Sequence, residues 1–168
     1  MERCSLSILP ESIGMMKFLQ YIRISRNESL LKLPDSIVEL RQLRALYLND
    51  TRINCIPKGF SVLNNMRNLV DCPAQMDGDL CSLQELGPLS QLSVLGINCL
   101  ENVSASSFAT KAMLDKKLRL SNLTLKCTNR LGGIAEEEQQ QIEEVFDELC
   151  PPSCLDWLRI LVGGSQGG

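Results

Sequence analysis

Residues 9–32 read LPESIGMMKFLQYIRISRNESLLK, and residues 33–55 read LPDSIVELRQLRALYLNDTRINC, which is a second copy of the same pattern. The copies are 24 and 23 residues long, and IPKGF opens a third copy at Ile56. Each copy contains a phrase of the form Leu-x-x-Leu-x-Leu, with Ile in place of Leu at some positions. Successive side chains of a strand point to opposite faces, so the last two apolar residues of the phrase share a face. Each copy therefore predicts a short strand that buries one face.

The phrase recurs along the chain at a spacing that widens. Its first positions are Leu19, Leu43, Met66, Leu92, Leu120 and Leu155, at intervals of 24, 23, 26, 28 and 35 residues. A period of this size with leucine at fixed offsets is typical of leucine-rich repeats, in which each copy adds one strand and one return segment to a stacked solenoid. We predict an α/β fold, a leucine-rich-repeat solenoid with a curved parallel sheet on the concave side and short helices and loops on the convex side.

The repeats predict one domain and a tail. We expect a leucine-rich-repeat domain over residues 1–162, with about six strands and a truncated first repeat. Residues 163–168, GGSQGG, predict a flexible Gly-rich tail. A single repeat has too little apolar surface to fold alone, so each coil depends on its neighbours.

The first convex segments begin at Leu-Pro pairs. Proline presets the backbone for the first position of a helix, and the acidic residues that follow, Glu11 and Asp35, suit the positive end of a helical turn. We therefore predict one short helical turn over residues 11–13 and another over residues 35–37.

Later segments depart from this regularity. Asp71 occupies the third inward position of its copy, so we expect Cys72-Pro73 to end that strand early and residues 73–82 to form an irregular excursion. Apolar residues at helical spacing predict longer convex helices over residues 107–118 and 134–149. The convex side is thus expected to thicken toward the C-terminal end.

Composition excludes several classes of function. Apolar residues make up 44% of the 168 residues and aromatic residues only 4%, which fits thin layers of leucine. The formal net charge of −3 does not predict nucleic-acid binding, although residues 1–75 carry 10 basic and 7 acidic side chains and residues 76–168 carry 7 and 13. The chain has no histidine and no phosphate-binding glycine loop, so we predict no metal, no cofactor and no enzymatic activity. We also expect no membrane span and no targeting signal, because long apolar runs are lacking.

The eight cysteines and four glycosylation sequons point in different directions. The cysteines are scattered along the chain, and we interpret most of them as small core residues in a reducing, cytoplasmic compartment. Asn27, Asn49, Asn102 and Asn122 each begin an Asn-x-Ser/Thr sequon, which has meaning only in a secreted chain. We assign these asparagines to repeat turns.

The variable positions between the leucines form an outward column on the predicted concave sheet. Its early coils are enriched in Arg and Tyr, which are frequent anchors of protein interfaces because they bury much area and keep a polar group. The predicted protein-binding residues are Tyr21, Arg23, Arg26, Arg44, Tyr47, Asn49, Asp50, Arg67, Trp157 and Arg159.

Several phrases of the chain resemble a known family. They are LPDSIVELRQLRALYL at residues 33–48, its copy at Leu9, LQELGPLSQLSVLGINCLENV from Leu83 and EVFDELCPPSCLDWLRI from Glu144. Together they look like the leucine-rich-repeat region of plant nucleotide-binding leucine-rich-repeat disease resistance proteins, closest to the coiled-coil class of cereals. The phrases span nearly the whole chain.

The resemblance implies a part of an intracellular receptor. Such a part recognises a pathogen effector or a guarded host protein and restrains an adjoining nucleotide-switch domain, which the basic N-terminal coils would contact. The coiled coil, the phosphate-binding loop and the switch domain are missing from the sequence, so we interpret the chain as a fragment, a truncated gene product or a decoy.

Two alternatives remain open on the residues. A cytoplasmic scaffold of the Ras-suppressor-like type shares the Leu-Pro pair and the 23-residue period, but it lacks the swollen C-terminal repeats. An extracellular receptor ectodomain fits the four sequons, but those repeats carry Leu-x-Gly-x-Ile-Pro where this chain has Leu-Pro-x-Ser-Ile.

Overall fold

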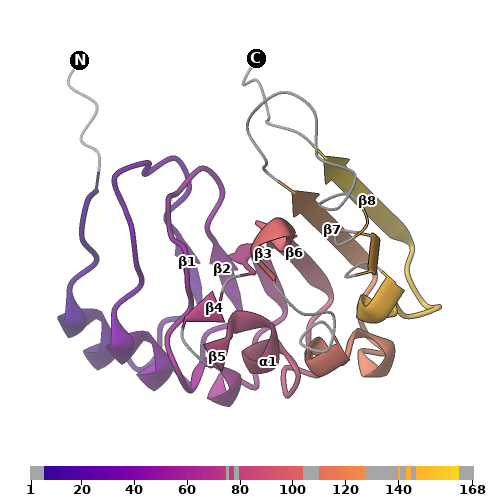
Figure 1. The fold of residues 1–168 in the computed structure, drawn as a ribbon. Coiled ribbons are helices and arrows are strands. Elements are labelled where there is room, and N and C mark those ends of the chain that lie inside the picture. Colours follow the sequence, from indigo (N-terminus) through magenta and orange to yellow (C-terminus); the bar gives the residue numbers. More distant parts are fainter. Residues whose placement is uncertain are drawn as a thin grey trace.

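The computed structural model describes residues 6–74, 76–77, 80–103, 110–127, 140, 143–144 and 147–162. Six parallel strands form one curved open sheet in the order β1-β2-β3-β6-β7-β8 (Figure 1). The strands are β1 (Tyr21–Arg23), β2 (Ala45–Tyr47), β3 (Asn68–Pro73), β6 (Val94–Asn98), β7 (Asn122–Cys127) and β8 (Trp157–Val162). The predicted fold class and the six strands are confirmed.

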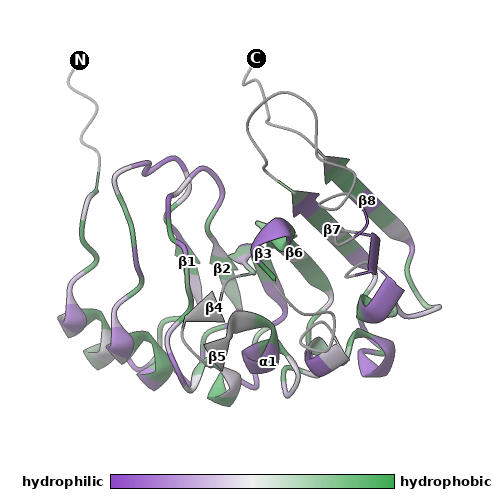
Figure 2. Cartoon of the chain, in the orientation of Figure 1, coloured by the Kyte–Doolittle hydropathy of each residue, from purple (hydrophilic) through white to green (hydrophobic). Residues whose placement is uncertain are grey.

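The register stacks equivalent residues of successive copies. Ile22 lies beside Leu46, which lies beside Leu69, which in turn lies beside Leu95. Leu46 and Leu69 are fully buried. In Figure 2 strands β6 and β8 are mostly apolar, whereas the convex turns carry both polar and apolar residues. The core is therefore a stack of aliphatic layers, as the repeat predicts.

Backbone hydrogen bonds between successive coils also join the residues at the start of each strand. The carbonyl of Gln20 accepts the N–H groups of Arg44 and Ala45, at 2.8 and 3.0 Å, and the carbonyl of Arg44 accepts those of Arg67 and Asn68 at 2.8 and 3.0 Å. The same forked bond recurs from β3 to β8 at Arg67, Ser93 and Ser121. These bonds set the register of each coil against the previous coil at the residue that precedes the strand.

The convex side consists of short helical turns, which line one border of the sheet in Figure 1. They are η1 (Glu11–Met15), η2 (Asp35–Glu39), η3 (Phe60–Val62), α1 (Ser82–Leu86), η4 (Leu100–Asn102), η5 (Thr110–Ala112) and η6 (Leu114–Lys116). The turns predicted over residues 11–13 and 35–37 are confirmed.

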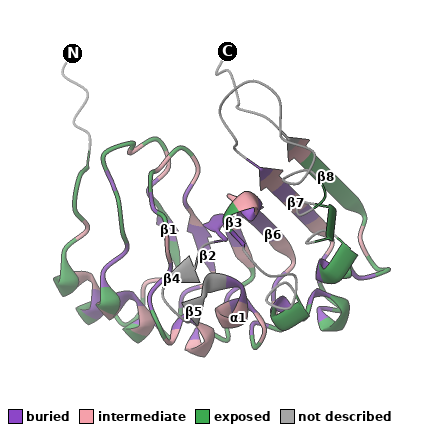
Figure 3. Cartoon of the chain, viewed as in Figure 1, coloured by how far each residue is buried: buried purple, intermediate pink, exposed green. Residues whose placement is uncertain are grey.

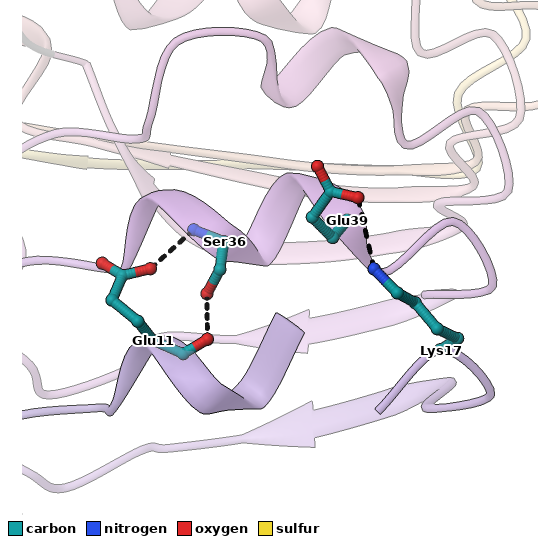
Figure 4. Close-up of polar contacts among 4 residues, drawn as sticks. All are labelled: Glu11, Lys17, Ser36 and Glu39. Carbon is teal, nitrogen blue, oxygen red and sulfur yellow. Dashed lines mark hydrogen bonds and ion pairs between the residues drawn. The ribbon is translucent and has the colours of Figure 1, made fainter. Parts of the chain in front are cut away.

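Glu11 caps the turn of the next coil. Its carboxylate accepts the backbone N–H group of Asp35 at 3.1 Å. It also accepts the N–H group of Ser36 at 2.9 Å, and the Ser36 hydroxyl donates to the Glu11 carbonyl at 2.6 Å (Figure 4). The Ser36 N–H bond lowers the pKa of Glu11. Lys17 and Glu39 form an exposed ion pair at 3.2 Å between the same two coils. The acidic residue after Leu-Pro therefore joins two coils.

Gly14 permits this close contact. A Cβ atom placed there would lie 2.6 Å from the Ser36 Cβ atom and 2.8 Å from its carbonyl oxygen, well inside van der Waals contact. The η1 and η2 turns can pack this closely because residue 14 has no side chain.

The end of the third strand is as predicted, but the strand is not short. β3 ends at Pro73, yet it has six residues where β1 and β2 have three each, and Cys72 takes the inward position beside Ile97. Asp71 is an extra residue with a φ of 61°, and the register shifts between Leu69 and Cys72. This is a β-bulge, which takes Asp71 out of the residue-by-residue pairing, and the pairing with β6 resumes at Cys72.

Residues 73–82 contain more order than we expected. Short antiparallel strands β4 (Met76–Asp77) and β5 (Leu80–Cys81) pair with each other, and α1 begins directly afterwards at Ser82. Leu83 and Leu86 are fully buried. The order of this coil therefore returns earlier than the sequence pattern predicts.

The helix predicted over residues 107–118 is wrong for the described part. Residues 110–116 form two separate turns, η5 and η6, because Met113 between them has a φ of 50°. Leu118, assigned to the apolar stripe, is 80% exposed. Most of the helix predicted over residues 134–149 lies outside the described residues, but residues 140, 143–144 and 147–149 are helical.

Lys117 lies in the core, where it closes the end of helix α1. Its ammonium donates to the carbonyls of Leu86 at 2.7 Å, Gly87 at 3.1 Å and Leu89 at 3.1 Å. Burial lowers the pKa of Lys117 to about 8. A buried lysine thus donates to the last carbonyl of α1 and to carbonyls of the turn that follows it.

The cysteines are less buried than we expected. Cys72 and Cys127 are buried, Cys55 and Cys99 are half-buried, and Cys150 and Cys154 are exposed. The prediction that most are core residues is therefore wrong for the six whose side chains are described. The physical reason is their place in turns, since Cys99 and Cys150 both have positive φ angles of 59° and 43°.

The last strand is covered on one side only. Leu158 and Ile160 lie beside the buried residues Leu123 and Leu125, but they are 45% and 51% exposed. Figure 3 shows most of β8 exposed, whereas buried and half-buried residues alternate along β7. The leucine layers therefore thin out at this edge of the sheet.

Candidate functional site

The outward positions of the sheet fall into three rows across the strands. The entry row precedes the strands and contains Gln20, Arg44, Arg67, Ser93, Ser121 and Asp156. The middle row contains Tyr21, Ala45, Asn68, Val94, Asn122 and Trp157, and the upper row contains Arg23, Tyr47, Val70, Gly96, Thr124 and Arg159. Strands lie about 4.8 Å apart, so neighbours within a row contact each other.

The structure brings five of the predicted residues together. We call them the Arg/Tyr patch, which consists of Tyr21, Arg23, Arg44, Tyr47 and Arg67 on β1, β2 and the coil that enters β3. Tyr21, Arg23 and Arg67 are exposed, while Arg44 and Tyr47 are half-buried. The patch extends over three neighbouring coils, a size that one segment of a partner can cover.

Tyr47 is held in place from both sides. The guanidinium carbon of Arg23 lies 4.7 Å from the centre of the Tyr47 ring, within the range of a cation–π contact. The Asn68 side-chain amide donates to the Tyr47 hydroxyl at 3.3 Å. Ordered side chains lose less entropy when a partner binds, so this arrangement favours recognition.

The other predicted residues lie apart from the patch. Arg26 and Asp50 occupy equivalent turns after β1 and β2, with φ angles of 65° and 57°, and both are exposed. Trp157 and Arg159 lie on β8, beside Asn122 and Thr124 and at the opposite end of the sheet. One continuous site does not include all ten residues.

Asn49 has a structural contact that the sequence does not reveal. Its side-chain amide donates to Asp71 Oδ2 at 3.0 Å, and Lys126 Nζ lies 2.6 Å from Asp71 Oδ1. Oδ1 has no other polar partner of hydrogen-bond geometry among the described residues, so the ammonium charge balances it. We conclude that Asn49 positions a buried carboxylate.

The Asp71–Lys126 pair crosses a strand. Asp71 belongs to β3 and Lys126 to β7, with β6 between them. The pair passes over Gly96, where an added Cβ would lie 3.0 Å from the Asp71 nitrogen and 3.7 Å from Asp71 Oδ1. The sequence contains a signal for this link, because a glycine replaces the usual large residue in the middle of β6.

Charge is uneven along the rows. Among the nine residues of the first three coils there are three arginines and no acidic residue, whereas the last three coils contain Asp156 and Arg159. Within the described part of the chain, no carboxylate pairs with Arg23, Arg44 or Arg67. Their guanidinium groups are available to an external acceptor.

The described residues offer little to a reaction. They contain no group of three or more His, Cys, Asp or Glu side chains that could hold a metal ion. Burial raises the pKa of the Cys127 thiol to about 11, which makes it a poor nucleophile at neutral pH. No helix in the described ranges is long and apolar enough to cross a membrane.

A curved parallel sheet on stacked leucine layers, with polar and aromatic side chains in outward rows, defines a repeat scaffold that mediates protein–protein interaction. The family described as leucine-rich repeat region matches residues 1–162, and the chain belongs to this family.

No curated protein matches the chain. A solved leucine-rich-repeat protein of Leptospira interrogans is similar, with a TM-score of 0.49 and 16% identity. The similarity covers 95% of this chain and 41% of that chain.

Proposed function

We propose that this chain is the protein-recognition module of an intracellular plant immune receptor. Its ligand is a pathogen effector or a guarded host protein, and its N-terminal coils restrain the nucleotide-switch domain of the complete receptor. The phrases LPDSIVELRQLRALYL and EVFDELCPPSCLDWLRI support this proposal, because they look like the corresponding region of those receptors.

The observation that carries the binding role is the Arg/Tyr patch. Three arginines without acidic partners and two tyrosines lie on adjacent outward rows, and the Arg23–Tyr47 contact orders part of the surface in advance. Such side chains supply most of the binding energy of many interfaces. We propose binding, not catalysis, as the task of this face.

The test is a pull-down from infected and healthy cereal tissue with the purified chain as bait. The variant Arg23→Ala/Tyr47→Ala/Arg67→Ala removes the centre of the patch. The matched control Arg52→Ala/Leu118→Ala/Arg119→Ala removes two exposed arginines and one exposed large apolar residue outside the rows.

We expect a partner from infected tissue that the wild-type chain and the control retain and the patch variant loses. All three proteins should have the same circular dichroism spectrum, because the changed residues lie outside the core. Retention of the partner by the patch variant would overturn the assignment of this face. Equal capture from healthy tissue would indicate a guarded host protein.

A further inference from the structure

We infer that the Arg/Tyr patch recognises an acidic, extended peptide segment of its protein partner. This inference rests on the proposed function and adds the chemistry of the ligand. It follows from the charge, spacing and order of the side chains on the first three coils.

The charge of the patch sets the kind of ligand. The outward positions of the first three coils contain no acidic residue, Asp71 of β3 is buried against Lys126, and Asp50 lies in the turn after β2. The patch therefore presents three positive charges. Arginine binds carboxylates through two parallel N–H bonds, so carboxylate side chains are the complementary groups in a protein.

The spacing favours an extended segment. Arg44 and Arg67 are neighbours in the entry row, about 4.8 Å apart at the backbone. Arg23 lies in the upper row, about 10 Å further along the strand direction, at about 3.3 Å per residue over three residues. In an extended peptide, side chains on one face recur about every 6.8 Å. Acidic residues at alternate positions can thus reach Arg44 and Arg67 together and leave a third for Arg23.

The tyrosines suit a peptide backbone better than a polyanion. Tyr21 is 64% exposed in the middle row, and the ordered ring of Tyr47 lies beside Arg23 in the upper row, so both offer flat apolar area beside the charges. The whole chain has a net charge of −3, which repels long polyanions such as nucleic acids. We therefore assign the patch to acidic peptide.

The probe is a fluorescein-labelled 12-residue peptide of alternating Glu and Ser. Matched peptides carry Gln or Lys in place of Glu, and a labelled 12-nucleotide single-stranded RNA represents the polyanion. Fluorescence anisotropy measures binding of each probe to the intact chain at 50 mM and 300 mM salt. The Arg44→Gln/Arg67→Gln variant tests the patch, and Arg52→Gln/Arg119→Gln removes the same charge from exposed positions outside the rows.

We expect the Glu peptide to bind, the Gln and Lys peptides to bind at least tenfold more weakly, and added salt to weaken binding. The patch variant should lose at least tenfold in affinity for the Glu peptide, and the control should stay within twofold of wild type. The inference is overturned if the Glu peptide does not bind at millimolar concentration, if the Gln peptide binds equally, or if the RNA binds more tightly with the same dependence on Arg44 and Arg67.

These results separate the two proposals. If the acidic peptide fails but the Arg23→Ala/Tyr47→Ala/Arg67→Ala variant still loses the tissue partner, the recognition face stands and the acidic ligand is wrong. If both fail, the face itself is wrong.

Discussion

Replacing Lys126 with Met should lower the free energy of unfolding, because the buried Asp71 carboxylate loses the positive charge that balances it. Removing one partner of a buried ion pair typically costs about 3–5 kcal/mol, because the other charge stays buried without compensation. Here the Lys126 side chain is 26% exposed and that of Asp71 is 7% exposed, and Asn49 keeps its bond to Oδ2. Water therefore screens part of the loss, and we expect a cost of about 2 kcal/mol.

The Asp71→Asn/Lys126→Met double variant separates this effect from packing. Asn keeps the shape of the side chain and tolerates a positive φ, such as the 61° at this position. The double variant removes both charges, so it should be about 1–2 kcal/mol more stable than the sum of the single losses predicts. Urea unfolding followed by far-UV circular dichroism measures the wild type, Lys126→Met, Asp71→Asn and the double variant.

The result that would refute this reasoning is a Lys126→Met loss below about 0.5 kcal/mol, the size of an ordinary surface substitution. Additive losses in the double variant would contradict it as well, because independent sites add. Either outcome would mean that the pair is solvated and does not bridge β3 and β7.

Three further predictions follow from other contacts. Gly14→Ala should cost about 1–3 kcal/mol in the same urea assay, because the new methyl group meets Ser36 at 2.6 Å, whereas Ser12→Ala on the same turn should cost less than about 0.5 kcal/mol. Between pH 8 and 9 the free energy of unfolding should rise by at most about 1 kcal/mol. The pKa of Lys117 is about 8 in the folded chain and 10.5 in the unfolded chain, so the unfolded state binds more protons in this range. Lys117→Met should abolish that rise. The measurement stops at pH 9 because the pKa of the Cys127 thiol is raised from 9.0 to about 11, which lowers the free energy of unfolding as the pH rises further. Iodoacetamide should label exposed Cys150 and Cys154 well before buried Cys127, as followed by mass spectrometry, and equal rates would contradict the burial of Cys127.

The repeat pattern was sufficient to predict the strands. Alternation fixes which residues face the core, and the recurrence fixes which strands are neighbours, so the pairing of Ile22 with Leu46 follows from the sequence alone. The middle and upper rows follow in the same way, since they are the remaining positions of the same alternation, whereas the entry row lies before the strands.

The bulge in β3 was not predictable by this logic. A polar residue at an inward position suggests an interrupted strand, but in the structure Asp71 is an extra residue and the pairing with β6 resumes at Cys72. The two polar partners of the Asp71 carboxylate are Asn49, 22 residues before Asp71, and Lys126, 55 residues after it. Only the stacking of coils brings them to Asp71.

Contacts between coils also changed the role of Glu11. The sequence suggests that the Glu11 carboxylate stabilises the start of its own helical turn. In the structure it accepts hydrogen bonds from backbone N–H groups of the next coil. Similarly, Glu85 accepts the N–H groups of Gly59 and Ser61 on the previous coil. Helix capping in this stack is therefore a contact between repeats.

The central claim, that the Arg/Tyr patch is the recognition face, is tested most directly by photo-crosslinking. A benzophenone amino acid replaces Tyr47 in one chain and the exposed convex residue Leu118 in another, and each is irradiated in an extract of infected cereal tissue. The account predicts a crosslinked partner at position 47 and none at position 118. A partner crosslinked from position 118 alone would contradict it, because the partner would then lie on the convex side.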